Sequence, residues 1–192
     1  MVLTLLMVLV FLLAAWAVHG DGALGVDRGA KALIRDGRAV ALETPMWLVG
    51  LLGTGYVLLP VTLVCSAVLW RRGHRLVAVW LPAVGVSAAL AIAVVKWLID
   101  KPRPTLRGYG FPSGHVFGVT VFVVLALYLF WSFEASPRWQ RAARAAAVAF
   151  VAVVGYSRIH VNAHWLSDVV GGLLAGMAFA LAIVLAMDAR LR

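Results

Sequence analysis

Residues 76–98 read LVAVWLPAVGVSAALAIAVVKWL, and Lys96, near the end of this stretch, is its one charged residue. A helix needs about 20 mostly apolar residues to cross the hydrocarbon core of a bilayer. The stretch therefore predicts a transmembrane helix. Pro82 predicts a kink within it, because neighbouring helices and waters in a membrane can satisfy the freed backbone groups.

The same pattern recurs along the chain. Of 192 residues, 64% are hydrophobic and 13% charged, with a mean hydropathy of +0.97, whereas soluble domains are about half apolar and about a quarter charged. These values predict an all-α, polytopic membrane protein forming one domain over residues 1–192, with a second proline kink at Pro60. The six predicted spans are roughly Val2–Val18, Pro45–Trp70, Leu76–Leu98, Val116–Phe133, Ala142–Tyr156 and Trp165–Met187.

Two segments near the N-terminus have alternative interpretations. The first span could be a secretory signal, because Ala15-Trp16-Ala17 has the form of a cleavage site, but residues 1–10 lack the Lys or Arg of such signals. We therefore expect an uncleaved helix. Residues 20–44 mix charged and apolar residues and are too polar to span. They predict an amphipathic helix at the membrane interface, with a plain connecting loop as the alternative.

The net charge of +9 favours contact with anionic lipid headgroups over nucleic-acid binding. The cations are scattered over the flanks of the spans and form no basic helix or basic stripe with interleaved aromatic residues. Cys65 is the one cysteine, so no intrachain disulfide forms. We expect the bilayer and a lipid substrate as partners, and the pattern indicates no obligate protein partner.

Polar residues gather in three clusters at the ends of the predicted spans. They are residues 96–104 (KWLIDKPRP), 111–115 (FPSGH) and 157–168 (SRIHVNAHWLSD). The third span ends and the fourth begins on one side of the membrane, and two further crossings return the chain to that side at Ser157. The topology therefore predicts that all three clusters meet at one membrane surface.

The composition of the clusters predicts a site for phosphate. Lys96, Arg103 and Arg158 would supply cations, and arginine matches phosphate oxygens in a bidentate fashion. Ser113 and Gly114 stand where a helix begins, and free N–H groups and the helix dipole favour an anion there. Ser157 has two interpretations, as a substrate contact or as a local bond to the backbone. Lys101 and Arg107 are expected to line the entrance or to meet lipid headgroups.

Two histidines suit nucleophilic and acid–base chemistry. His164 and Asp168 are four residues apart at the predicted start of a helix, so they should share a face. A carboxylate on one ring nitrogen leaves the other free to attack. His115, from another cluster, could protonate the leaving oxygen. His160 lies four residues before His164, and we interpret it as a structural or rim residue rather than a metal ligand.

These motifs resemble the signature of the type 2 phosphatidic acid phosphatase superfamily: K-x(6)-R-P, P-S-G-H and S-R-x(5)-H-x(3)-D. All three occur here in order, from Lys96 to Asp168. The resemblance implies a six-helix membrane bundle that needs neither metal nor other cofactor. It implies that His164 is a nucleophile oriented by Asp168 and that His115 is the general acid and later the base. The implied phosphate-binding residues are Lys96, Arg103, Ser113, Gly114 and Arg158.

The resemblance leaves open which lipid is the substrate, whether water or another acceptor receives the phosphoryl group, and how the chain is oriented in the membrane. We expect undecaprenyl pyrophosphate first, then phosphatidylglycerophosphate or phosphatidic acid. Transfer of the phosphoryl group from the lipid to another acceptor is one alternative. A small channel or transporter is a weaker one, because it predicts charges throughout the depth of several spans, whereas here the charges lie at the span ends on one face. When Lys96, Arg103 and Arg158 are set aside, slightly more cations flank the side that holds the termini. This favours cytoplasmic termini and an extracytoplasmic site in the cell membrane.

Overall fold

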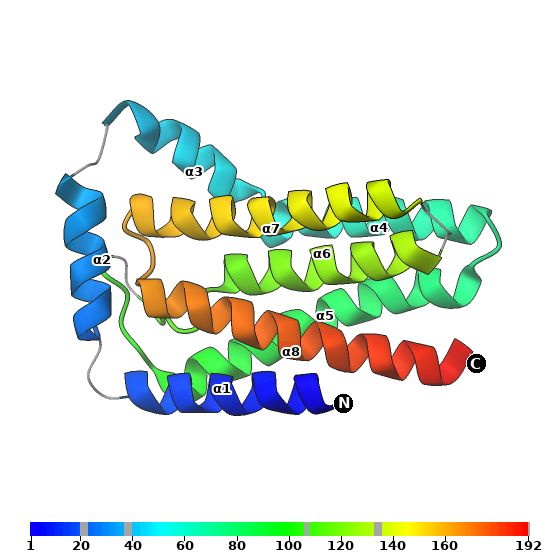
Figure 1. The fold of residues 1–192 in the computed structure, drawn as a ribbon, viewed down its shortest axis with the longest axis horizontal. Helices are drawn as coiled ribbons and strands as arrows, with labels where there is room; N and C mark the ends of the chain where they lie inside the picture. The colour runs from blue at the N-terminus through cyan, green and yellow to red at the C-terminus, as the bar shows by residue number, and fades with distance from the viewer. Residues whose placement is uncertain (20–22, 37–39, 106–107, 133–135, 192) are drawn as a thin grey trace.

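The computed structural model describes residues 1–19, 23–36, 40–105, 108–132 and 136–191, and its described elements are all helical. The long helices run side by side along the molecule, and both termini lie toward the same end (Figure 1). The elements are α1 (Val2–Val18), α2 (Gly25–Asp36), the 3-10 turn η1 (Val40–Leu42), α3 (Glu43–Leu51), α4 (Gly55–Arg71), α5 (Arg75–Ile99), α6 (Gly114–Ser132), α7 (Pro137–His160) and α8 (Leu166–Leu191).

Four of these helices, α5 to α8, are long and apolar enough to cross a membrane. Large hydrophobic side chains such as Leu9, Val64 and Leu90 face outward along the bundle, as lipid-facing side chains do. The chain is therefore a membrane protein. Helix α1 is apolar over 17 residues, which is short for a full crossing. The count of six spans stays a prediction.

The second predicted span is broken. Helices α3 and α4 meet at an angle of 42°, at residues 52–54. Short-range bonds replace the helical pattern there, with Gly53 N donating to Gly50 O at 3.1 Å and Thr54 N to Leu51 O at 2.9 Å. Pro60, where we expected a kink, lies inside α4, and Pro82 lies inside α5. A Cβ at Gly53 would lie 3.0 Å from the Cβ of His115, so the break brings the chain against the start of α6.

Helix α2 falls within the segment expected at the interface. It runs across the end of the bundle opposite the termini, roughly at right angles to the long helices (Figure 1). Its residues GVDRGAKALIRD are amphipathic, and they form a helix rather than the plain loop that was the alternative. Its position at a membrane surface stays a prediction.

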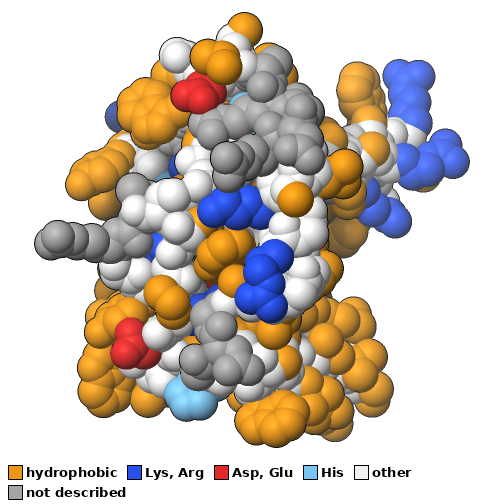
Figure 2. Space-filling model, turned by 90° about the vertical axis from the view of Figure 1, so that its left-hand side faces the viewer, with side chains coloured by type: hydrophobic (Ala, Val, Ile, Leu, Met, Phe, Trp, Pro, Cys, Tyr) orange, Lys and Arg blue, Asp and Glu red, His pale blue; other side chains and the backbone are white. Residues whose placement is uncertain are grey.

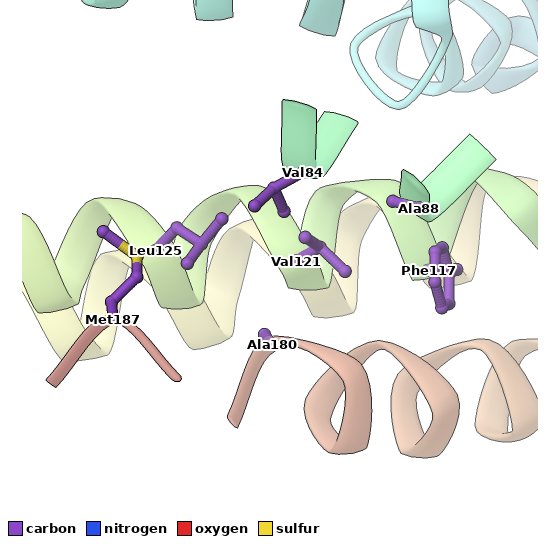
Figure 3. Packing of buried hydrophobic residues seen from close by; sticks show 7 residues of the cluster. All are labelled: Val84, Ala88, Phe117, Val121, Leu125, Ala180 and Met187. Atoms are coloured by element: carbon purple, nitrogen blue, oxygen red, sulfur yellow. The ribbon is translucent and has the colours of Figure 1, made fainter. Parts of the chain in front are cut away.

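The hydrophobic core lies between α5, α6 and α8 (Figure 3). Side chains from the three helices interdigitate along the middle of the bundle, and Phe117 packs on Phe179 with ring centroids 5.7 Å apart. The buried cluster consists of Val84, Ala88, Phe117, Val121, Leu125, Ala180 and Met187. This core holds α6 and α8 together, and these two helices begin at the end where the polar clusters lie.

Glycines on α8 allow α6 to approach closely. A Cβ at Gly172 would lie 2.6 Å from the carbonyl oxygen of Ser113, and one at Gly176 would lie 2.8 Å from the Cβ of Thr120. Small residues at such interfaces let membrane helices pack by direct contact of their backbones. The position of Ser113 thus depends on the absence of a side chain at Gly172.

We expect Gly172→Ala to lower the free energy of unfolding in detergent by about 1–3 kcal/mol, because the added methyl group meets backbone that cannot move aside. Thermal unfolding of the purified protein measures the change. Gly85→Ala, in α5, is the matched control, since a Cβ there meets nothing within 4 Å. Equal stability of Gly172→Ala and the control would contradict this packing.

Candidate active site

The three polar clusters meet at one end of the molecule, as the topology predicted. The C-terminal end of α5, the start of α6 and the connection from α7 to α8 all lie at the end crossed by α2 (Figure 1). Viewed from that end, Lys and Arg side chains gather in the middle of the face, with hydrophobic side chains around them (Figure 2). A cationic centre at the mouth of an apolar bundle suits an anionic group on a lipid.

His164 and Asp168 form a direct pair. His164 Nδ1 lies 3.2 Å from Asp168 Oδ2, and the backbone N–H of Trp165 donates to the same oxygen at 3.0 Å. The histidine stands in the turn before α8, which begins at Leu166, rather than on the helix as we expected. The pairing arises because Asp168, in the first turn, accepts from the turn that precedes it. With Nδ1–H donated to the carboxylate, Nε2 is free to attack.

The turn that carries His164 is fixed by the end of α7. Asn162 adopts a left-handed conformation with φ of 58°, which asparagine tolerates better than most residues. The carbonyl oxygen of Arg158 then accepts the N–H groups of Ala163 at 3.0 Å and His164 at 3.2 Å. These bonds hold the backbone of the nucleophile candidate.

The His164 ring is buried, with 2% of the residue exposed. Burial lowers the pKa of His164 below its ordinary value, and Lys96 and Arg103 lower it further, against the opposing effect of Asp168. Because an imidazole ordinarily titrates near pH 6.5, a lowered pKa leaves the ring neutral at neutral pH. A neutral ring with a free Nε2 can act as a nucleophile.

His115 faces His164 from the start of α6. The two ring centroids lie 6.4 Å apart with the rings at 66°. His115 is half-buried and interacts electrostatically with Arg158, Arg103 and Lys96. The two histidines thus come from different elements and face each other beside Lys96, Arg103 and Arg158.

Lys96 and Arg103 converge on one backbone carbonyl. Lys96 Nζ donates to Tyr109 O at 3.1 Å and to Gly110 O at 3.3 Å, and Arg103 Nε donates to Tyr109 O at 3.0 Å. A Cβ at Gly114 would lie 3.7 Å from Lys96 Cε, so Lys96 also lies beside the start of α6. Both cations are half-exposed and are held close to where the predicted phosphate would sit.

Ser113 is fully buried at the start of α6. Its N–H donates to the carbonyl oxygen of Asp168 at 2.8 Å, which ties this motif to the His164–Asp168 motif. Its Oγ has no hydrogen-bond partner within the part of the chain that the structure describes. A buried hydroxyl without a partner is costly, and a phosphate oxygen would satisfy it.

Arg158 is buried at the end of α7 and is held on several sides. Its Nε donates to Ser157 Oγ at 3.1 Å, and its Nη2 donates to Met46 O at 3.1 Å. A Cβ at Gly50 would overlap the guanidinium, so α3 needs glycine there. Ser157 Oγ itself donates to Val154 O at 2.7 Å, which favours the local-bond interpretation of this serine.

The family model described as the PAP2 superfamily matches residues 105–192, a range that contains the second and third motifs. Residues 105–192 therefore carry a PAP2 superfamily domain. The first motif, with Lys96 and Arg103, lies before the matched range.

The chain is similar over most of its length to two curated relatives. Phosphatidylglycerophosphatase B of Bacillus subtilis is 24% identical over 182 residues, covering 88% of this chain and 87% of the relative. Undecaprenyl-diphosphatase of Sulfolobus acidocaldarius is 26% identical over 186 residues, covering 90% and 84%. The crystal structure of the first transmembrane PAP2 type phosphatidylglycerolphosphate phosphatase from Bacillus subtilis superposes with a TM-score of 0.89 at 22% identity, covering 100% of this chain and 98% of that one. The last likeness shows a common fold.

No group of three or more His, Cys, Asp or Glu side chains is arranged to hold a metal ion within the described ranges. His160, considered as a metal ligand from its spacing, is buried with its Nδ1 3.3 Å from the hydroxyl of Tyr156. This fits the structural role that we expected for it.

The expectation that Lys101 lines the entrance is wrong. Helix α5 ends because Asp100 adopts a left-handed conformation, with φ of 48°, and this turns Lys101 inward, where 1% of it is exposed. Its ammonium group lies 3.0 Å from Asp168 Oδ1. Sequence patterns missed this contact, and also missed Asp27 of α2, which is buried beside it. Arg107, the other residue expected at the entrance, lies outside the described residues.

Proposed function

We propose that this chain is a lipid phosphate phosphatase that forms a phosphohistidine at His164 and hydrolyses it. The observation that carries the proposal is the pair of His164 with Asp168, which faces His115 and lies near the cations Lys96 and Arg103. Nucleophile, orienting carboxylate, acid and cations are the parts that phosphoryl transfer through a covalent intermediate needs.

In the first step, His164 Nε2 attacks phosphorus and the bond from phosphorus to the leaving oxygen breaks. The ring gains positive charge as the P–N bond forms, and Asp168, bonded to Nδ1–H, stabilises that charge. His115 gives its proton to the leaving oxygen. The dianionic phosphate offsets the repulsion between a protonated His115 and the nearby cations.

In the second step, water attacks the phosphohistidine. His115, now neutral, takes a proton from the water as its oxygen bonds to phosphorus. The P–N bond breaks and returns its electron pair to His164 Nε2, and inorganic phosphate leaves. Lys96, Arg103, Arg158, Ser113 and the N–H of Gly114 hold the phosphoryl oxygens in both steps, where charge neutralisation and positioning supply most of the rate.

The side chains of the site recognise phosphate, and the apolar rim of this end suits a lipid tail. We rank undecaprenyl pyrophosphate first, then phosphatidylglycerophosphate and phosphatidic acid; the names of the two curated relatives support the first two substrates. The balance of flanking cations supports cytoplasmic termini, and with them a site on the extracytoplasmic face of the cell membrane.

Phosphate release from these three lipids by the purified protein in detergent, with excess EDTA, tests the proposal. We expect release from at least one lipid and the same rate with and without EDTA, since the cations of the site come from the chain itself. Glycerol 3-phosphate, an ester without acyl chains, is the control and should be a poorer substrate. Release from none of the lipids would refute the phosphatase, and activity lost with EDTA and restored by metal would refute the metal-free mechanism.

A further inference from the structure

Behind the His164–Asp168 pair lies a second set of buried polar groups that the reaction steps do not use. Asp27, on α2, and Lys101, after α5, are each 1% exposed. Charged side chains are costly to bury unless they are paired. The groups that pair with Asp27 and Lys101 therefore decide how these two charges act on the site.

Asp27 joins α2 to the start of α8. Its Oδ1 accepts the backbone N–H of Ser167 at 2.7 Å, and its Oδ2 accepts the Ser167 hydroxyl at 2.7 Å and the N–H of Leu24 at 3.0 Å. The N–H groups in the first turn of a helix have no partner within the helix and carry partial positive charge. Asp27 therefore caps α8 from another helix, one residue before Asp168.

Lys101 joins Asp27 to Asp168. Its Nζ lies 3.3 Å from Asp27 Oδ2 and 3.0 Å from Asp168 Oδ1, and it donates to Ser167 Oγ at 2.5 Å. The ammonium group thus donates hydrogen bonds to Asp27 and Ser167 and forms ion pairs with the carboxylates of Asp27 and Asp168. The lysine is thus held in one place by the beginning of α8 and by α2.

The two oxygens of Asp168 are engaged on different sides. Oδ1 faces Lys101 at 3.0 Å, while Oδ2 accepts from Trp165 N at 3.0 Å and faces His164 Nδ1 at 3.2 Å. A carboxylate held at both oxygens cannot rotate freely about its Cβ–Cγ bond. Lys101 therefore keeps Oδ2 directed at the imidazole.

We propose that Lys101, held by Asp27, is a positioning residue that fixes the Asp168 carboxylate against His164 and sets how much positive charge the ring accepts. The proposal rests on the proposed function only in taking His164 as the nucleophile. Lys101 partly neutralises Asp168, and Asp27 partly neutralises Lys101. The two buried charges therefore act on His164 with opposite signs.

The other charged groups around His164 come from each neighbouring element. Asp168 pairs with it from α8, Lys96 acts from α5 and Arg103 from the connection to α6. His115 of α6 faces its ring, and Arg158 of α7 interacts with His115. Since the single variants below substitute none of these five groups, a changed titration of His164 reports on the loss of Lys101 or Asp27.

The test compares Asp27→Asn, Lys101→Met and the double variant. For each, kcat, KM and the fall of kcat/KM at low pH (the acid limb) are measured. The acid limb reports the pKa of the nucleophile in the free enzyme. Removing the cation makes a protonated His164 more favourable, so we expect Lys101→Met to move the limb to higher pH by about one unit. Asp27→Asn should move the limb to lower pH, and the double variant should return toward wild type. Misplacement of Asp168 should lower kcat of Lys101→Met about 10²-fold, with KM little changed, because other residues hold the phosphate.

Lys31→Met is the matched control, since Lys31 is a lysine of α2 placed 5.0 Å from the ring of Trp165, and its limb should coincide with wild type. Acid limbs that stay at the wild-type pH in both Lys101→Met and Asp27→Asn would overturn the proposal, even if both variants lose stability. Nitrogen-15 NMR of the His164 ring, assigned against His164→Gln, gives the same titration without substrate. A wild type inactive on every lipid phosphate would refute the proposed function, and the NMR shifts would still support or overturn the coupling.

Discussion

His164→Gln should lower the release of phosphate from lipid substrates by at least about 10⁴-fold, because it removes the attacking nitrogen and no neighbouring group can replace it. Glutamine keeps a similar volume and can still donate to Asp168 Oδ2, which now faces His164 Nδ1 at 3.2 Å. The variant should therefore fold, with a melting temperature in detergent close to that of wild type. Initial rates on the best lipid of the panel measure the loss.

His74→Gln is the matched control for this variant. His74 precedes α5, at the end of the bundle opposite the site (Figure 1), so the same substitution there should leave the rate unchanged. A His164→Gln protein that is folded and retains a rate within about tenfold of wild type would rule out His164 as the nucleophile.

His115→Gln should show a loss that depends on the leaving group. A lipid alkoxide needs a proton as it leaves, and general acid catalysis contributes about 10²–10⁴-fold. We expect a loss of that size on the lipid, and a much smaller loss in the first step on p-nitrophenyl phosphate, whose leaving group needs no proton. Pre-steady-state release of p-nitrophenol isolates that step.

The comparison between substrates is its own control, because a general disturbance of the site would slow both. Equal losses on lipid and aryl phosphate would contradict the role of His115 as the acid. The position of His115, with its ring centroid 6.4 Å from that of His164, agrees with a group that acts on the opposite side of the phosphoryl group from the nucleophile.

The convergence of the three motifs could be predicted because span topology fixes it. The ends of apolar runs are visible in a sequence to within a few residues, so the predicted span Leu76–Leu98 corresponds to α5 at Arg75–Ile99. An even number of crossings between motifs then returns them to the same end. The return of the motifs to one end does not depend on how the helices pack.

The break between α3 and α4 could not be seen in the same way. Hydropathy is averaged over about 19 residues, and an interruption of three residues at 52–54, which include Leu52, hardly changes that average. Pro60 and Pro82, where the sequence predicted kinks, lie inside helices. What ends α3 is a set of short-range backbone bonds that periodicity does not reveal.

The burial of Lys101 and Asp27 beside Asp168 could not be predicted from the sequence for a different reason. Lys101 and Asp27 are 74 residues apart and lie on elements whose packing no pattern predicts. Lys101 looked like a flank charge because it follows a span. Only the left-handed turn at Asp100, together with the position of α2 across the bundle, places both side chains beside Asp168.

The identity of the phosphorylated residue tests the central claim most directly. His115→Gln protein mixed with p-nitrophenyl phosphate should accumulate the phosphoenzyme, because the first step proceeds while no base activates water for the second. Quenching at alkaline pH, where phosphohistidine survives, followed by peptide mass spectrometry should place one phosphate on His164. Phosphate on any other residue, or p-nitrophenol released by this variant over many turnovers without any phosphorylated peptide, would contradict the account.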